Sequence, residues 1–179
     1  MTQITLAVTG SISAYKAADI TSQLTKLGFE VKVLMTPAAR KFITPLTLQI
    51  LSKHQVGLDV MIEDDPQRIE HIDIGKETDL FLVAPASANT IAKLAMGLAD
   101  NMVTSTALAL PQTTKKLLAP AMNTKMLEHP ATQRNLKLLQ DYGYQIIQPR
   151  DAVLACGDKG AGALAPVETI VETVKENCL

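Results

Sequence analysis

Aromatic side chains are scarce in this chain of 179 residues, and tryptophan is absent. Phe, Trp and Tyr together make up 3% of the sequence, whereas hydrophobic residues make up 47%. The interior must therefore be filled mainly by Leu, Ile, Val, Ala and Met. A chain of this length can bury a substantial core within one folding unit. We therefore expect a single ligand-binding domain over residues 1–179.

Cysteine is scarce, and long apolar runs and an excess of charge of one sign are missing. Cys156 and Cys178 are too few for a disulfide scaffold and lack the spacing of metal ligands, so we expect no metal site. No apolar run approaches the roughly 20 residues that cross a bilayer, and the amino terminus lacks the features of a signal peptide. With 17 basic and 18 acidic residues, the chain has no basic stripe for nucleic acid. We expect a cytoplasmic protein with neither a membrane nor a nucleic-acid partner.

Short apolar runs rich in β-formers alternate with segments of helical periodicity. This alternation is typical of βαβ units, and nearly continuous apolar strands are typical of a parallel sheet covered on both faces. The expected fold class is a doubly wound α/β three-layer sandwich, Rossmann-like or flavodoxin-like, which binds ligands at the carboxyl ends of its strands. We expect strands at 4–9, 31–35, 79–84, 115–119 and 144–147, and helices at 14–27, 37–42, 45–51, 71–76, 87–96, 101–110, 130–142 and 167–177.

The segment Gly10-Ser11-Ile12-Ser13 follows the first expected strand. A glycine there lets the backbone approach a ligand, and the following N–H groups and hydroxyls can face a phosphate. The three-glycine dinucleotide pattern is missing, which disfavours NAD. An ordinary strand–turn–helix junction with a capping serine explains the same residues equally well. Thr36 offers a further hydroxyl at the end of the second expected strand.

The segment Pro85–Thr90 directly follows the third expected strand. Its small residues would let a flat ring lie against the backbone, and Ser87, Asn89 and Thr90 offer short hydrogen-bonding groups. Helix capping by Ser87 is the simpler explanation. Small polar side chains directly after an apolar strand tip the balance towards a ligand site.

Asn123 comes soon after the fourth expected strand, in the segment 119–126. Its amide can donate to a substrate carboxylate without adding a charge of its own. Taken alone, however, an N-cap for the following short helix is the better explanation.

His71 and Cys156 are the two remaining candidates for chemistry. A histidine can act as a base near neutral pH, although a lone histidine is more often structural or exposed. Cys156 lies in the glycine-rich segment 155–162, which predicts a mobile loop able to close over a substrate. The cysteine could serve as proton donor or nucleophile, and Lys159 could meet a phosphate. The simpler explanation is a hairpin tip with an incidental cysteine.

Taken together, these segments resemble the homo-oligomeric flavin-containing cysteine decarboxylases. That family has an N-terminal Gly-Ser turn, a histidine before the third strand, a PASANT motif and a PXMNXXMW motif. This chain has Gly10-Ser11, His71, PASANT at 85–90, and PAMNTKML at 120–127. The matches cover nearly the whole chain in the same order. Leu127 departs from the family's tryptophan, which affects the packing beside the site.

The segment Ala155–Gly160 looks like that of one branch, the phosphopantothenoylcysteine decarboxylases. The resemblance implies a carboxy-lyase that converts 4'-phosphopantothenoylcysteine to 4'-phosphopantetheine and CO2 in coenzyme A biosynthesis. The substrate thiol would be oxidised with FMN, CO2 would leave, and the product would be reduced again. Since the chain ends at Leu179, we expect a separate phosphopantothenoylcysteine synthetase to supply the substrate.

The resemblance also implies a role for each site residue. His71 would be the base of the oxidative half, and Cys156 the acid of the reductive half. Asn123 would hold the substrate carboxylate, with Met122 and Met126 packed nearby. The family's site lies between subunits of a trimer, or of a dodecamer built from trimers, so His71 is expected to act on flavin held by a neighbour. FMN would be held by Gly10, Ser11, Thr36, Ser87, Ala88, Asn89, Ser105 and Thr106.

Four other functions compete with this assignment. A flavin prenyltransferase shares the fold and FMN, but PXMNXXM, His71 and Cys156 count against it. A peptidyl-cysteine decarboxylase of lantibiotic synthesis releases an oxidised enethiol and does not need Cys156. A non-catalytic FMN-binding regulator of the known fungal kind would carry long acidic extensions. A generic flavodoxin-like domain would require the PASANT and PXMNXXM matches to be chance.

Overall fold

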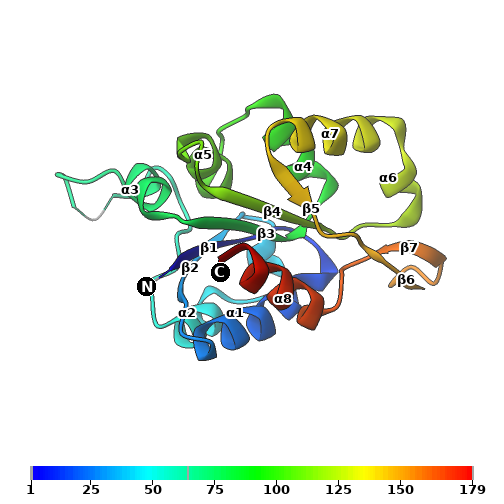
Figure 1. Cartoon of the computed structure of the whole chain (residues 1–179), viewed down its shortest axis with the longest axis horizontal. Helices are drawn as coiled ribbons and strands as arrows, with labels where there is room; N and C mark the ends of the chain where they lie inside the picture. The colour runs from blue at the N-terminus through cyan, green and yellow to red at the C-terminus, as the bar shows by residue number, and fades with distance from the viewer. Residues whose placement is uncertain (1, 64, 179) are drawn as a thin grey trace.

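The centre of the molecule is a parallel sheet of five strands in the order β2-β1-β3-β4-β5 (Figure 1). The computed structural model describes residues 2–63 and 65–178. Each expected strand is present within about two residues of its expected bounds, which confirms the α/β fold class. The strands are β1 (Gln3–Val8), β2 (Glu30–Met35), β3 (Leu80–Ala86), β4 (Lys115–Pro120) and β5 (Tyr144–Ile146).

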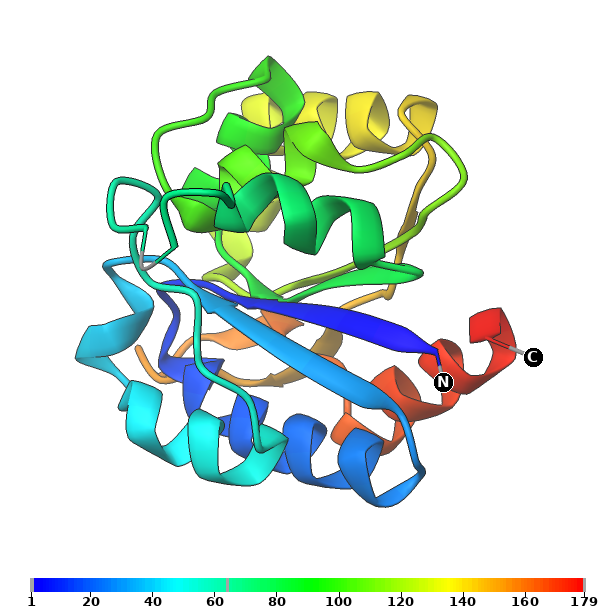
Figure 2. The same ribbon diagram turned by 90° about the vertical axis from the view of Figure 1, so that its left-hand side faces the viewer.

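Helices cover both faces of the sheet, as Figure 2 shows from the side. Successive strand residues alternate between the faces, so Leu82 joins one apolar cluster while Phe81 and Val83 join the other. The first cluster packs beneath α1 (Ala17–Lys26), α2 (Pro45–Ser52) and α8 (Val167–Cys178). The second packs beneath α3 (Glu70–Glu77), α4 (Ala88–Met96), α5 (Met102–Ala109) and α7 (Pro130–Asp141).

Local sequence explains where several helices begin and end. Thr44 caps α2 by accepting a hydrogen bond from the Thr47 N–H, and Pro45 follows at the first turn, where its missing N–H is tolerated. Asn101 and Thr104 form a reciprocal capping box at the start of α5. Gly28, with φ of 87°, ends the helical segment that precedes β2.

The strand order reverses between β1 and β3, because the chain leaves β1 towards β2 and returns to the other side of β1 as β3. In open α/β sheets, ligands bind beyond the carboxyl ends of the strands at such a reversal. A buried threonine joins the two strand ends: the Thr9 hydroxyl donates to the Pro85 carbonyl at 2.6 Å and accepts from the Ser87 N–H at 2.9 Å. This edge of the sheet is therefore the candidate ligand site.

Two expectations need correction. First, β3 continues through Ala86, so Pro85 and Ala86 belong to the strand and the segment after it begins at Ser87. Second, the segment 155–162 is not an irregular loop. It forms the turn and most of one strand of an antiparallel hairpin, β6 (Arg150–Val153) and β7 (Lys159–Ala163), at one end of the long axis (Figure 1). Within residues 2–63 and 65–178, no helix is long and apolar enough to cross a membrane.

Candidate functional site

Two serines lie just beyond the carboxyl ends of β1 and β3. Ser11 caps a 3-10 turn at 12–16 by accepting from the Ser13 N–H at 3.2 Å. Ser87 caps α4 by accepting from the Thr90 N–H, also at 3.2 Å, and its hydroxyl lies 3.3 Å from that of Thr90. The capping explanation therefore holds at both positions. A capping hydroxyl accepts with a lone pair and can still donate its hydrogen, so Ser11 remains able to contact an anion. The Ser87 hydroxyl donates to the Thr90 hydroxyl and would have to exchange that bond for one to a ligand.

The turns after β1 and β2 pack closely at the same edge. A Cβ on Gly10 would lie 2.5 Å from the Ala38 Cβ, so only glycine allows this approach. Thr36 is buried, and its hydroxyl accepts from the Ala39 N–H at 3.2 Å. Ala88 is half-buried and Asn89 exposed in the first turn of α4. These expected ligand residues thus gather along the carboxyl edge of the sheet.

Ser105 and Thr106 lie further along, on α5, and both are buried. The Thr106 hydroxyl is fully enclosed and has no hydrogen-bond partner among the described residues. A buried polar group without a partner is rare in native proteins and calls for a ligand, a water or another explanation. Ser105 lines an open groove of about 470 Å³ that also contains His71.

Asn123, Cys156 and Asp158 form a hydrogen-bonded cluster beside the end of β4. Asn123 caps α6 (Thr124–Glu128) through its Oδ1, which accepts from the Lys125 N–H at 2.9 Å. Its Nδ2 donates to the Cys156 Sγ at 3.2 Å and to the Asp158 Oδ2 at 3.0 Å. The Cys156 thiol donates to the same carboxylate at 3.4 Å. The cluster therefore joins a neutral amide, a thiol and a carboxylate.

Hydrogen bonds account for the charge state of this cluster. The Asn123 amide, and next the Cys156 thiol, hold the pKa of Asp158 below its ordinary value. Asp158 is therefore a carboxylate at neutral pH. Asp158 is not among the candidate residues of the sequence analysis. Its position two residues after Cys156 is the only sequence feature that points to it.

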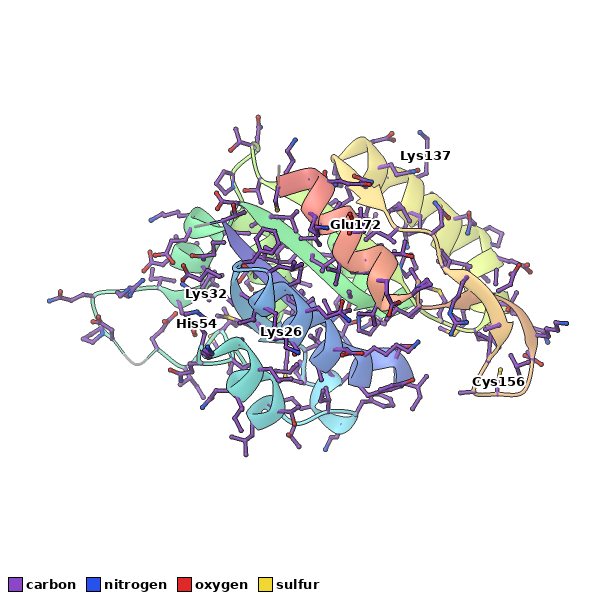
Figure 3. The ribbon with its side chains drawn as sticks, turned by 60° about the horizontal axis from the view of Figure 1, so that its bottom comes forward. Lys26, Lys32, His54, Lys137, Cys156 and Glu172 are labelled. Atoms are coloured by element: carbon purple, nitrogen blue, oxygen red, sulfur yellow. The ribbon has the colours of Figure 1, made fainter. Side chains whose placement is uncertain are left out.

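Close backbone contacts hold the hairpin against the end of β4. The Met122 N–H donates to the Gly162 carbonyl at 2.9 Å, and the Thr124 hydroxyl donates to the Ala161 carbonyl at 2.6 Å. Gly162 has φ of 131°, and a Cβ there would lie 2.2 Å from the Met122 carbonyl oxygen. Glycine is required at this position for close packing, whereas the glycine-rich sequence predicts a mobile loop. Cys156 lies at the outer tip of this packed hairpin (Figure 3).

The remaining expected substrate residues surround this cluster. Met122 is half-buried against the core, and Met126 is 50% exposed on α6. Lys159 is exposed at the start of β7. Leu127, at the position of the family's tryptophan, is buried.

His71 lies elsewhere, near the start of α3. It is half-buried in the groove with Ser105, Met61 and Leu108, and its Nδ1 is enclosed without a hydrogen-bond partner in the described part of the chain. Figure 1 places α3 and the β6–β7 hairpin at opposite ends of the long axis. One copy of the chain therefore brings Asn123 together with Cys156 but keeps His71 apart from them.

The fold and these residues define an α/β protein with a candidate ligand site at the carboxyl edge of a parallel sheet and a thiol–amide cluster beside it. The chain belongs to the flavoprotein family, whose model matches residues 1–179.

Two curated relatives match almost the whole chain. A probable phosphopantothenoylcysteine decarboxylase of Streptococcus mutans is 63% identical over 174 residues, which cover 97% of either protein. A coenzyme A biosynthesis bifunctional protein of Bacillus subtilis is 46% identical over 97% of this chain. That match spans only 42% of the bifunctional protein's length.

Solved structures of related proteins superpose on almost the whole of this chain. A cysteine-to-serine mutant of a PPC decarboxylase, complexed with pantothenoylaminoethenethiol, superposes with a TM-score of 0.90 at 32% identity, covering 98% of this chain and 97% of the other. The FMN binding protein AtHal3 superposes with a TM-score of 0.85 at 33% identity, covering 98% of this chain and 95% of the other.

The contact between Gly162 and Met122 generates a prediction. Gly162→Ala should detach the hairpin from β4, because the new Cβ would overlap the Met122 carbonyl oxygen. The matched control is Gly157→Ala on the same hairpin, where φ is also positive, at 88°, but no atom lies within 4 Å of the added Cβ. Both variants place an alanine at a positive φ, which side chains rarely adopt. The left-handed α conformation costs about 1–2 kcal/mol per residue, and the φ of 131° at Gly162 lies further from that region than the φ of 88° at Gly157. Limited proteolysis between residues 150 and 163 should be faster for Gly162→Ala than for the control, and equal rates would contradict the packing role.

Proposed function

We propose that this chain decarboxylates 4'-phosphopantothenoylcysteine to 4'-phosphopantetheine and CO2 in coenzyme A biosynthesis, with FMN as cofactor. The observation that carries the proposal is the contact of the Cys156 thiol with the Asn123 amide. It places an acid beside the group best suited to hold a carboxylate. The similarity to a probable phosphopantothenoylcysteine decarboxylase supports it.

The carboxyl edge has the donors that FMN requires. Ser11, Ser87 and Asn89 offer neutral hydrogen-bonding groups around the β1–β3 reversal, and no acidic residue lies in 9–16, 36–41 or 85–90 to repel a phosphate. The unpartnered Thr106 hydroxyl is a further buried donor. We propose that Gly10, Ser11, Thr36, Ser87, Ala88, Asn89, Ser105 and Thr106 hold the cofactor. Bound FMN would supply two-electron chemistry by accepting a hydride and later returning it.

Asn123 and His71 would serve the oxidative half of the reaction. Direct loss of CO2 from a cysteine would leave an unstabilised carbanion. Oxidation of the thiol to a thioaldehyde provides a group that accepts the electron pair left behind by CO2. His71 would remove the thiol proton during this oxidation. Asn123 would hold the carboxylate through Nδ2, and Met122 and Met126 would pack against the substrate.

Cys156 would serve the reductive half. Loss of CO2 leaves an enethiolate, and the exposed thiol would protonate the carbon that carried the carboxylate. Lys159, exposed on the same hairpin, would meet the substrate phosphate. A peptidyl-cysteine decarboxylase releases the oxidised enethiol and needs no such acid, so the Cys156–Asn123 contact favours the coenzyme A branch.

The separation of His71 from Asn123 supports a site shared between copies of the chain. Apolar side chains line the His71 groove, among them Met61, which is 87% exposed, and Leu108, which is 59% exposed. Exposed apolar surface of this kind is typical of an interface. We propose a trimer, alone or within a dodecamer, in which His71 of one copy faces the Asn123 and Cys156 of the next.

The substrate's source and the cellular location complete the proposal. We propose that a separate phosphopantothenoylcysteine synthetase supplies the substrate. We also propose a cytoplasmic location, where a reducing environment would keep the Cys156 thiol free.

Mass spectrometry of the purified protein incubated with 4'-phosphopantothenoylcysteine tests the function directly. The expected product is lighter than the substrate by CO2 alone, and FMN is released when the protein is denatured. If the protein binds FMN but leaves this substrate unchanged, the assignment is wrong, and cysteine-terminated peptides and prenyl donors are the next substrates to try.

His71→Asn should keep yellow, bound FMN yet release no CO2, because asparagine cannot accept the thiol proton. His129→Asn is the matched control: His129 is exposed and caps α7, a role that asparagine also fills. Flavin absorbance and trapping of labelled CO2 measure the two effects. Full CO2 release by His71→Asn would remove this histidine from the mechanism.

Cys156→Ser should still release CO2 but accumulate the oxidised enethiol, since a serine hydroxyl is a far weaker acid than a thiol. Cys178→Ser, which changes the only other cysteine, should behave like the wild type. Chromatography with mass detection separates the enethiol from the thiol product. Normal 4'-phosphopantetheine formed by Cys156→Ser at the wild-type rate would rule out the acid role.

A further inference from the structure

Asp158 holds the amide group that the substrate would need. Asn123 has two N–H bonds at Nδ2, and one is directed to the Cys156 Sγ and the other to the Asp158 Oδ2. Its Oδ1 is occupied by the Lys125 N–H. The side-chain amide thus has no free donor while the hairpin tip is in this position, and a substrate carboxylate must displace at least one of these contacts to reach it.

The carboxylates of Asp158 and the substrate would repel each other if both were bound to this amide. Asp158 is ionised at neutral pH, because its hydrogen bonds to Asn123 and Cys156 lower its pKa. A substrate carboxylate at the same Nδ2 would face a like charge within a few ångströms, which is unfavourable. Asp158 is also exposed, on a two-stranded hairpin that projects from one end of the molecule (Figure 1), so its displacement requires no change in the core.

We propose that Asp158 competes with the substrate carboxylate for the Asn123 amide, and so brings Cys156 to the site only after CO2 has left. This inference rests on the proposed function, and it adds a positioning role for a residue that contacts the proposed acid. While the substrate carboxylate occupies Asn123, the hairpin tip is displaced. Once CO2 departs as a neutral molecule, the amide is free and Asp158 returns with Cys156.

The chemistry that follows is a balanced reduction. The Cys156 Sγ–H proton goes to the carbon that lost CO2, which converts the enethiolate to a thioaldehyde. Bound FMN, in its reduced form, would supply the hydride that converts the sulfur-bearing carbon of this thioaldehyde to the product thiolate. The Cys156 thiolate and the product thiolate each recover a proton from solvent, to which Cys156 is exposed. The carboxylate of Asp158 takes no part in bond making and only positions the thiol.

Asp158→Ala separates this role from a structural one. The variant removes the competitor, so KM for 4'-phosphopantothenoylcysteine should fall while the rate of flavin reduction stays at the wild-type value. Reoxidation of the flavin by the bound intermediate should slow by about tenfold or more, as expected from losing a hydrogen bond to a charged group. Anaerobic stopped-flow absorbance gives both rates, and the fraction of product released as oxidised enethiol should rise.

Two further variants separate the charge of Asp158 from its hydrogen-bonding capacity and provide a control on the same hairpin. Asp158→Asn retains an oxygen that can accept from Asn123 but removes the charge, so it should lower KM with a smaller effect on reoxidation. Asp151→Asn changes another exposed aspartate of the same hairpin, on β6, and should match the wild type in every measurement.

The outcomes are distinguishable. Wild-type KM, reoxidation rate and product ratio in Asp158→Ala would overturn the inference and leave the proposed function standing. A raised KM with both half-reactions slowed together would indicate a merely structural role and would overturn it too. If the wild-type protein itself releases no CO2 from this substrate, the proposed function fails, and the inference fails with it.

Discussion

The common direction of the five strands determines where this protein can do chemistry. Because all five are parallel, their carboxyl ends lie along one edge, and the strand order reverses there between β1 and β3. The buried Thr9 hydroxyl ties the two strand ends together through Pro85 and Ser87. The Gly-Ser turn, the PASANT segment and Asn123 are separated in sequence, but each lies at the carboxyl end of a strand of this sheet. They lie near one another only because they share the carboxyl edge of the sheet.

Packing of small residues then adds the β6–β7 hairpin to this edge. Gly162 allows the hairpin backbone to touch Met122, and the hairpin delivers Cys156 and Asp158 to the Asn123 amide. The same fold keeps His71 in a separate groove towards the opposite end of the long axis (Figure 1). The proposed reaction uses His71 as base and Cys156 as acid, and this separation is the reason that we propose a site shared between copies of the chain.

Sequence predicted the sheet well because parallel strands buried on both faces are continuous apolar runs, and the caps at Asn101 and Gly28 are local signals. It predicted the short helix after Asn123 for the same reason. For the segment 155–162 the sequence left a mobile loop and a hairpin tip open, and it could not decide between them because Gly162 is needed for a contact with a residue 40 positions earlier in the chain. Asp158 was missed because its role depends on that same long-range contact. The separation of His71 from Cys156 is equally a property of the three-dimensional arrangement.

Complementation between two inactive variants tests most directly whether the site is shared between copies. His71→Asn lacks the proposed base, and Asn123→Asp keeps the helix cap but places a negative charge where the substrate carboxylate should bind. Each protein alone should release almost no CO2 from 4'-phosphopantothenoylcysteine. Oligomers assembled from both should regain activity, because one copy's Asn123 then meets another copy's His71. Mixed oligomers as inactive as the separate variants would contradict the shared site.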